Sequence, residues 1–320
     1  MTHIEHGTGG GRALVVGWYS FPGMGATAGD LLARDVVCEW LNEARIPYDV
    51  AVAVPFVDGV SLEHLDPHHY SRLVFVCGPF GNGPPLTGLL SAFSHCELIG
   101  VDVSMLDPIE KWNPFSLLLE RDSSRTVAPD LAFAGQSESV PVVGVLKVHH
   151  QNEYGRRARH DDANSAIDRM LTRTQVACVP IETRLDTNDA GHHSAGQVES
   201  LIARMDAVVT TRLHGCVLAL KHGVPPLVID PIAGGAKVRR QCEAIGWELI
   251  FTVDDLHDDL LLAAMHQALD PHTRERARAC ANDATRRLQA VRTTFLDWFT
   301  PLSVPVQPGS VPSTDHPAEP

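Results

Sequence analysis

Short runs of apolar residues alternate with amphipathic stretches along most of this chain, and glycine-rich turns separate many of them. In the first half the pattern predicts strands over 14–18, 49–54, 73–77 and 98–103, with a helix over 30–43. Strands that alternate with helices are typical of parallel sheets joined by right-handed crossovers. The first half is therefore expected to form an α/β domain.

The same alternation starts again after a polar break over 135–140. The elements expected there are strands over 142–148, 176–180, 207–210 and 227–229 and helices over 161–173, 194–205 and 215–222. Two such halves predict two domains, which we place at 12–135 and 141–270.

The chain ends in two segments of different character. A charged helix is predicted over 271–300, and residues 301–320 follow with six prolines and few bulky apolar side chains. A segment of that composition cannot bury enough surface to fold, so we expect a disordered tail over 301–320.

The stretch over 206–230 is the most informative part of the sequence. Its first strand is followed at once by Arg212 and His214, and then by a helix that Gly223 and Pro225 bring to an end. The start of a helix offers free backbone N–H groups and the positive end of the helix dipole, which makes this turn a natural anion site. An imidazole beside an anion site indicates proton transfer to a phosphorylated or carboxylated substrate.

Composition narrows the class of protein. The 26 lysines and arginines against 39 acidic residues give a net charge of −13, which argues against a nucleic-acid partner. A phosphate site must then be a local cluster of cations, drawn from Arg212, Lys237, Lys147 and Arg121. Seven cysteines without a Cys-x-x-Cys motif, no secretory signal and no transmembrane run predict a cytoplasmic protein.

Four features, in order along the chain, resemble the polysaccharide pyruvyl transferase family. They are Gly29-Asp30 at the start of the first helix, Arg121-Asp122-Ser123-Ser124 followed by Pro129-Asp130-Leu131-Ala132-Phe133, Thr211-Arg212-Leu213-His214-Gly215 followed by Ala219, Gly223 and Pro225, and Lys237 after the strand end at Asp230-Pro231. The turn over 78–83 departs from the family, which usually has a run of three glycines there, because it contains Pro79 and Phe80.

The resemblance implies a fold and a reaction. The fold would be two Rossmann-like domains that face each other across a cleft, as in type B glycosyltransferases. The reaction would move the pyruvyl group of phosphoenolpyruvate onto a sugar of a cell-surface or exopolysaccharide precursor, forming a pyruvate ketal. The first domain would bind the acceptor and the second the donor. Phosphoenolpyruvate is then a substrate, and no cofactor is expected.

The resemblance also suggests roles for particular residues. His214 would protonate C3 of the donor, and Arg212 would clamp the donor's anionic groups with support from Lys237. The substrate-binding residues expected in addition are Lys147, His149, Gly29, Asp30, Arg121 and Asp122. The base that takes the sugar proton stays open among Asp30, Asp122 and His149.

Plainer explanations stand beside these roles. Arg212 could cap the helix, His214 could be satisfied by backbone, and Asp30 could be only a helix cap. Lys147 could belong to a solvated cluster at a strand end, and Arg121 could form a surface ion pair with Asp122. We expect no metal, because the paired histidines are adjacent in sequence and lack ligands at suitable spacing.

Two alternative functions remain open from the sequence alone. One is a metal-independent glycosyltransferase of the same fold that uses a nucleotide sugar, and the other is a non-catalytic relative. An acceptor that is lipid-linked would bring the protein to the inner face of the membrane, although the sequence shows no evident amphipathic anchor.

Overall fold

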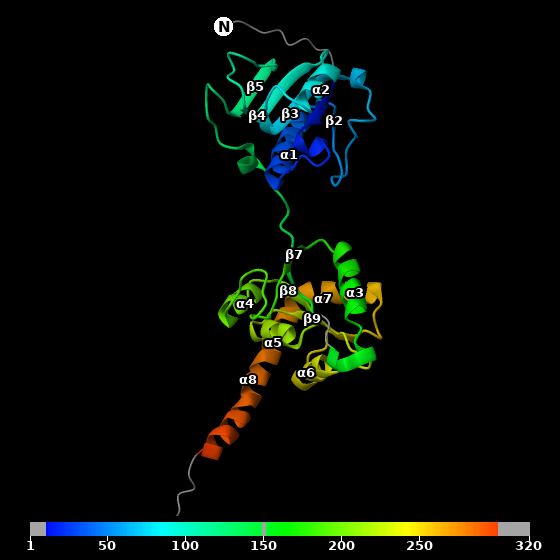
Figure 1. Cartoon of the computed structure of the whole chain (residues 1–320), viewed down its shortest axis with the longest axis vertical. Helices are drawn as coiled ribbons and strands as arrows, with labels where there is room; N and C mark the ends of the chain where they lie inside the picture. Colours follow the sequence, from blue (N-terminus) through cyan, green and yellow to red (C-terminus); the bar gives the residue numbers. More distant parts are fainter. Residues whose placement is uncertain (1–10, 149–151, 300–320) are drawn as a thin grey trace, which may run out of the picture. The chain divides into compact units, whose positions relative to one another are not determined.

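The computed structural model describes residues 11–148 and 152–299 (Figure 1). The chain divides between Glu138 and Ser139 into two compact units, which we call unit 1 and unit 2. This boundary lies within the polar break over 135–140.

Unit 1 is built on one parallel five-stranded sheet with the order β2-β1-β3-β4-β5. Its main elements are β1 Arg12–Val16, α1 Ala28–Glu43, β2 Tyr48–Val50, β3 Tyr70–Phe80, α2 Leu86–Ala92, β4 Glu97–Met105 and β5 Leu117–Asp122. Side chains alternate between the two faces of the sheet. Ala13 and Val15 pack in a cluster with residues of α1, whereas Leu14 and Val16 pack in a cluster with residues of α2.

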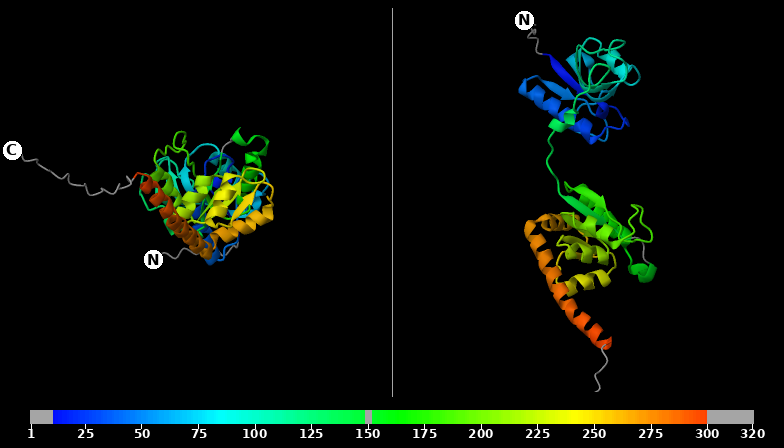
Figure 2. Two further views of the ribbon diagram at one scale, coloured as in Figure 1. Left: turned by 90° about the horizontal axis from the view of Figure 1, so that it is seen from below. Right: turned by 90° about the vertical axis from the view of Figure 1, so that its left-hand side faces the viewer.

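Unit 2 is built on a second parallel five-stranded sheet, with the order β10-β9-β8-β6-β7. Its main elements are β6 Val142–Leu146, α3 His160–Thr172, β7 Ala177–Pro180, α4 Ala195–Ile202, β8 Ala207–Thr210, α5 Leu213–Lys221, β9 Pro226–Asp230, α6 Lys237–Ile245, β10 Ile250–Thr252, α7 Asp258–Leu269 and α8 Pro271–Phe299. Figure 2 shows these helices packed around the sheet, except for the far end of α8.

The two sheets have the same topology. In each, the second strand along the chain lies on one side of the first strand and the third strand lies on the other side. The strand order therefore reverses between β1 and β3 in unit 1 and between β6 and β8 in unit 2. Ligands of open α/β sheets bind at the carboxyl ends of the strands beside such a switch point. The prediction of two Rossmann-like domains is confirmed.

Several elements differ from the expectation. The structure adds α2, β5, α6, β10 and α7, for which no element was predicted. Helix α1 begins at Ala28 instead of Asp30, and Thr27 is its N-cap residue. The expected tail over 301–320 lies outside the described residues. All seven cysteines are free, and no helix of the described chain is long and apolar enough to cross a membrane.

Candidate functional site

A pocket of about 170 Å³ lies in unit 2 at the carboxyl ends of β6, β8 and β9. Its lining residues are Val148, Thr183, Thr211, Arg212, Leu213, His214, Asp230, Pro231, Ile232, Lys237 and Val238. Arg212, His214 and Lys237, which the sequence predicted as donor-binding or catalytic residues, thus surround one pocket. The position beside the switch point is where this topology places ligands.

Two threonines at the end of β8 fix the turn that carries Arg212. The hydroxyl of Thr210 accepts a hydrogen bond from the Arg212 N–H at 2.9 Å, and the hydroxyl of Thr211 accepts one from the Val148 N–H at 2.7 Å. Gly215 allows the first turn of α5 to lie directly on Thr210. A Cβ atom at position 215 would come within 2.2 Å of the Thr210 Oγ1 atom.

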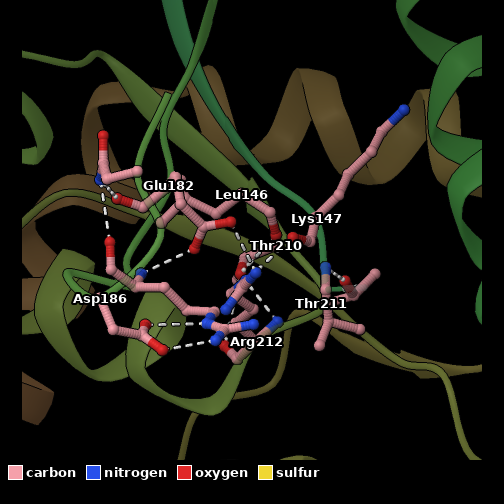
Figure 3. A network of polar contacts seen from close by, with 10 residues as sticks. Leu146, Lys147, Glu182, Asp186, Thr210, Thr211 and Arg212 are labelled. Atoms are coloured by element: carbon pink, nitrogen blue, oxygen red, sulfur yellow. Dashed lines mark hydrogen bonds and ion pairs between the residues drawn. The ribbon is translucent and has the colours of Figure 1, made fainter. Parts of the chain in front are cut away.

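Arg212 is held rigidly by neighbours that the sequence did not indicate. Its Nε donates to the carbonyl oxygen of Lys147 at 2.8 Å, and its Nη2 lies 2.8 Å from the Glu182 Oε2 (Figure 3). Burial lowers the pKa of Arg212, and the charge of Glu182 opposes that effect. Arg212 occupies the N-cap position of α5, but its side chain makes no capping bond. The helix-cap explanation is therefore wrong for this side chain.

The ion pair with Glu182 leaves part of the Arg212 guanidinium for a ligand. Its Nη1 makes no hydrogen bond to any other residue that the structure describes. Because the side chain lines the pocket, Arg212 can present its remaining guanidinium N–H groups to an anion there. Glu182 fixes where those groups point.

His214 and Lys237 stand at the starts of two helices that meet at the pocket. His214 is the second residue of α5, is exposed, and its ring forms no hydrogen bond within the described chain. Backbone satisfaction of the imidazole is thus not seen. Lys237 is the first residue of α6, and its Nζ lies 5.8 Å from the centroid of the Tyr154 ring. The two helix N-termini add positive potential to that of the side chains.

Asp230 organises the far wall of the pocket. This carboxylate is fully buried and accepts hydrogen bonds from the N–H groups of Ile232 at 3.1 Å, Ala236 at 2.7 Å and Arg239 at 2.9 Å. By accepting the bond from the Arg239 N–H, Asp230 caps the first turn of α6, although Asp230 itself lies in β9. Asp230 therefore fixes both the loop over 231–236 and the position from which Lys237 extends.

The backbone carbonyl of Lys147 accepts a hydrogen bond from Arg212, but the side chain of Lys147 lines a different pocket. The ammonium group forms an ion pair with Asp168, and both residues line a neighbouring pocket of unit 2 together with Glu182. Figure 3 shows the Lys147 side chain pointing away from Arg212. His149, the other residue expected here, lies outside the described residues.

Unit 1 has its own pocket, of about 470 Å³, at the carboxyl ends of β1 and β3. Its lining residues are Trp18, Met24, Gly25, Thr27, Gly29, Asp30, Cys77, Gly78, Pro79, Arg121 and Asp130. Gly29, Asp30 and Arg121 thus line one pocket, and Arg121 is not among the lining residues of the unit 2 pocket that holds Arg212 and Lys237. Asp122 is not among the lining residues, and it accepts a hydrogen bond from the Ser104 hydroxyl at 2.5 Å.

Gly78 allows the wall of this pocket to form. It has a φ of +82°, and a Cβ atom there would lie 2.4 Å from the Trp18 Cδ1. The indole N–H of Trp18 donates to the Pro79 carbonyl at 3.1 Å. The departure from the family's glycine run therefore has a structural role, since Phe80 is buried in the core and Pro79 lines the pocket.

Acidic groups and a buried thiol gather at the unit 1 pocket, where Cys77 and Asp130 are lining residues. Cys77, Asp102 and Asp130 offer ligand atoms that lie within 4.8 Å of one another. Arg121 already lies against two of them, with its Nη1 2.7 Å from the Asp130 Oδ2 and 3.6 Å from the Cys77 Sγ. Because a guanidinium neutralises this cluster, we assign no metal to it.

Asp102 and Cys77 are the residues of unit 1 that sequence reasoning missed. Both have a positive φ, and Asp102 is only 5% exposed while its Oδ2 has no hydrogen-bond partner among the described residues. Burial raises the pKa of Asp102, and burial together with nearby carboxylates raises the pKa of Cys77. The signal in the sequence was an aspartate inside the apolar strand over 98–103.

Comparison with protein families identifies the central part of the chain. Residues 117–231 match the family model described as polysaccharide pyruvyl transferase. The matched region runs from β5 to the end of β9 and includes Arg121, Arg212 and His214. This part of the chain is a polysaccharide pyruvyl transferase domain, which confirms the predicted family and the prediction of an enzyme. Comparison with the curated proteins finds no match.

Solved structures of remote sequence also align with the chain. The UDP-GlcNAc 2-epimerase of Methanocaldococcus jannaschii is 11% identical, with 81% of this chain and 92% of that chain covered and a TM-score of 0.30. The spinosyn forosaminyltransferase SpnP is 13% identical, with 88% of this chain and 98% of that chain covered and a TM-score of 0.32. TM-scores this low support no conclusion about function.

Proposed function

We propose that this enzyme of the polysaccharide pyruvyl transferase family transfers the pyruvyl group of phosphoenolpyruvate to a sugar of a polysaccharide precursor and forms a ketal. One observation carries the proposal: Arg212, His214 and Lys237 surround a single pocket at the N-termini of α5 and α6. Two cations and a titratable imidazole at one small pocket suit a small dianionic donor that must be protonated.

The donor has two anionic groups to place, a phosphate and a carboxylate. Arg212 offers its remaining guanidinium N–H groups, Lys237 offers an ammonium group, and the first turns of α5 and α6 offer backbone N–H groups. These donors can hold both groups with C3 near His214. Because Glu182 and the Lys147 carbonyl hold the guanidinium of Arg212, its remaining N–H groups keep one orientation.

The reaction begins with transfer of a proton from His214 to C3 of phosphoenolpyruvate. The methylene becomes a methyl group and C2 becomes electrophilic. A sugar hydroxyl then forms a bond to C2 and gives its proton to a base. The C2–O bond to phosphate then breaks, and phosphate leaves with the bonding electrons. A second hydroxyl of the same sugar forms a bond to C2, and its proton goes to the departing phosphate. The product is a six- or five-membered ketal, depending on which hydroxyls react.

We propose unit 1 as the acceptor domain and Asp30 as its first candidate base. Asp30 lines the unit 1 pocket. Asp122 does not, and its Oδ2 accepts a hydrogen bond from the Ser104 hydroxyl and lies 3.6 Å from the Arg121 Nε. The Oδ2 of Asp30 accepts from the Thr27 N–H and hydroxyl, each at 2.7 Å, which fixes the carboxylate. Asp30 is thus both a capping residue of α1 and a candidate for contact with sugar hydroxyls.

Ligand-dependent thermal stability tests the donor assignment. Phosphoenolpyruvate at 100 times its dissociation constant should stabilise the fold by about 2.7 kcal/mol. The shift should vanish in Lys237→Gln combined with Arg212→Gln and persist in Asp30→Asn, which changes only unit 1. A melting temperature that responds to a nucleotide sugar and not to phosphoenolpyruvate would show the donor assignment to be wrong.

A further inference from the structure

The indole ring of Trp18 lines the unit 1 pocket and is only partly buried. Trp18 follows Gly17 directly after β1, so it stands beside the switch point, where this topology binds ligands. Part of the ring packs against the core of unit 1, where the ring centroids of Phe75 and Phe21 lie 6.2 Å and 6.0 Å from that of Trp18. The part that is not buried is available to a ligand in the pocket.

The turn over 78–83 holds Trp18 in this place. The Pro79 carbonyl accepts the indole N–H at 3.1 Å, which satisfies the only polar atom of the side chain. Phe80 packs against Phe75 at 4.8 Å, and the Phe75 ring meets the Trp18 ring edge to face at 86°. The two residues that replace the family's glycines thus both help to fix Trp18. What the ring offers to a ligand is its apolar π surface.

A carboxylate borders the same small space as this ring. A Cβ atom at Gly78 would lie 2.4 Å from the Trp18 Cδ1 and 3.6 Å from the Asp30 Oδ1. The Asp30 Oδ2 is held by the N–H and the hydroxyl of Thr27, so Oδ1 is the oxygen that Thr27 leaves for a ligand. Asp30 is only 8% exposed, which fixes the carboxylate relative to the ring.

The charged groups of the pocket favour a neutral ligand. Its lining residues include two carboxylates, Asp30 and Asp130, and one cation, Arg121. The Arg121 Nη1 lies 2.7 Å from the Asp130 Oδ2, and its Nη2 donates to the Ser104 hydroxyl at 2.7 Å. A phosphate would therefore meet two carboxylates and, among these lining residues, a single guanidinium that is already paired. Hydroxyl groups, in contrast, can donate to the carboxylates.

The start of α1 does not change this preference. Thr27 and Asp30 form a capping box there, in which each side chain binds the backbone N–H of the other residue. The carboxylate of Asp30 thus already lies at the positive end of the helix dipole. An aromatic ring could also stack on a nucleotide base, but the phosphates of a nucleotide would lack a cationic site in this pocket.

A sugar matches both parts of this arrangement. Its hydroxyls radiate from the edge of the ring, and its faces present C–H groups that the negative face of an aromatic ring attracts. We propose that Trp18 is the residue on which the acceptor sugar stacks, with a C–H face against the indole and one hydroxyl donating to the Asp30 Oδ1. The acceptors selected in this way are pyranosides with one face free of axial hydroxyls.

This inference rests on the proposed function for one point, the assignment of unit 1 as the acceptor domain. It adds the residue that selects the sugar and the face by which the sugar is held. Sugar binding can be measured without phosphoenolpyruvate, and donor binding can be measured without a sugar. The two assignments can therefore fail separately.

Saturation-transfer NMR on the unchanged full-length protein tests the stacking without any substitution. The probes are the methyl glycosides of glucose, galactose, mannose and N-acetylglucosamine, titrated to high millimolar concentration. We expect at least one of them to bind, and the C–H protons on one face of its ring to receive markedly more saturation than those on the other face. Failure of all four to bind, or equal saturation of both faces, would overturn the proposal.

Substitution of Trp18 tests the residue itself. Trp18→Leu keeps an apolar side chain but loses the π surface, so the affinity for the glycoside should fall about tenfold, whereas Trp18→Phe should lower it less than about threefold. The matched control is Trp40→Leu, which removes a tryptophan of α1 that is exposed and does not line the pocket, and which should bind as the unchanged protein does. Because Trp18 also packs on Phe75, folding is checked by circular dichroism and by the melting shift with phosphoenolpyruvate, which arises in unit 2.

Tryptophan fluorescence gives a second signature. The emission change caused by the bound glycoside should disappear in Trp18→Phe and persist in Trp40→Phe. Unchanged affinity in a folded Trp18→Leu variant would show that the ring only packs in the core. A Trp18-dependent emission change with uridine diphosphate, and none with the glycosides, would make this a nucleotide pocket. Glycoside binding that depends on Trp18 in a protein that ignores phosphoenolpyruvate would instead refute the donor assignment alone.

Discussion

Units 1 and 2 have the same sheet topology, but the pockets at the corresponding position of the two sheets differ in the charge of their side chains. Both sheets have the same strand order, and in both a pocket lies at the carboxyl ends of the strands beside the switch point. The pocket of unit 2 has Arg212, His214 and Lys237 on its wall with one carboxylate, Asp230, whose oxygens accept backbone hydrogen bonds. The pocket of unit 1 has Asp30 and Asp130 on its wall with one arginine, Arg121.

The difference shows which part of a site belongs to the fold and which to the side chains. The fold supplies the location, because parallel strands end together and loops diverge at the switch point. The side chains supply the chemistry. A cationic pocket at two helix N-termini suits an anionic donor, whereas carboxylates beside an aromatic ring suit a neutral, hydroxyl-rich acceptor. The following substitutions test that division.

Replacement of His214 should have the largest effect. His214→Gln keeps a hydrogen-bonding side chain of similar size but cannot deliver a proton, so turnover should fall about 10²–10⁴-fold. The affinity for phosphoenolpyruvate should change little, because the cations are unchanged. Steady-state kinetics and calorimetric titration measure the two quantities. His193→Gln, at an exposed position away from the pocket, is the control. Turnover within a few-fold of the unchanged enzyme would remove His214 as the acid.

Replacement of Arg212 should affect binding more than turnover. Arg212→Lys keeps the charge but loses the planar group that joins Glu182 and the Lys147 carbonyl. Hydrogen bonds to charged groups contribute about 1.5–3 kcal/mol, so the affinity for phosphoenolpyruvate should fall about 10- to 100-fold. Arg184→Lys, which alters an exposed arginine paired with Asp186, should leave the affinity unchanged. Equal affinity in Arg212→Lys would indicate a purely structural arginine.

The glycine of the same turn tests packing without changing a charge. In Gly215→Ala the new methyl group would crowd the Thr210 hydroxyl, which also positions Arg212. Overpacking costs about 1–3 kcal/mol, so the melting temperature should fall by several degrees. Gly196→Ala lies in α4 with open space around it and should instead stabilise the protein by about 0.4–1 kcal/mol. Equal melting temperatures for the two variants would contradict the close contact.

Local patterns in the sequence predicted much of this architecture, because strand, turn and helix alternate regularly. They failed for β5, where Leu117 and Leu119 are about half exposed at the sheet edge and give no buried alternation. They also gave no sign of α6, whose start is fixed by Asp230 through bonds across a loop. Edge position and long-range capping are properties of the assembled fold.

The residues of the candidate site were likewise predictable from the sequence only in part. The turn with Arg212 and His214 is visible because its residues are consecutive, and Lys237 follows from the resemblance. Glu182 is not visible, since it lies 30 residues from Arg212 and nothing local links the two. Lys147 shows the converse, because its position at a strand end was predicted correctly while its side chain pairs with Asp168. Side-chain direction depends on neighbours that a sequence does not reveal.

The smallest expected effect is that of a substitution at Asp102 of unit 1, which should stabilise the protein instead of weakening it. Burial raises the pKa of this carboxyl, and the neighbouring Asp130 adds to the effect, while the Leu131 N–H and Arg121 oppose it. A carboxyl with a higher pKa in the folded state binds its proton more tightly there. The free energy of unfolding therefore falls as the pH rises from the unfolded-state pKa, about 3.9, through the folded-state pKa.

Asp102→Asn should remove this loss and raise the melting temperature at neutral pH. Asparagine cannot ionise, and its side-chain oxygen can still accept the hydrogen bond that the Leu131 N–H now donates to Asp102 at 3.0 Å. The gain should shrink as the pH falls toward about 4, where the aspartate is itself protonated. Calorimetry across this range measures the difference, with the exposed Asp189→Asn as a control that should show none. A loss of stability at pH 7 would mean that the charge of Asp102 holds Arg121 in place, and the acidic groups at the unit 1 pocket would then form a structural ion cluster.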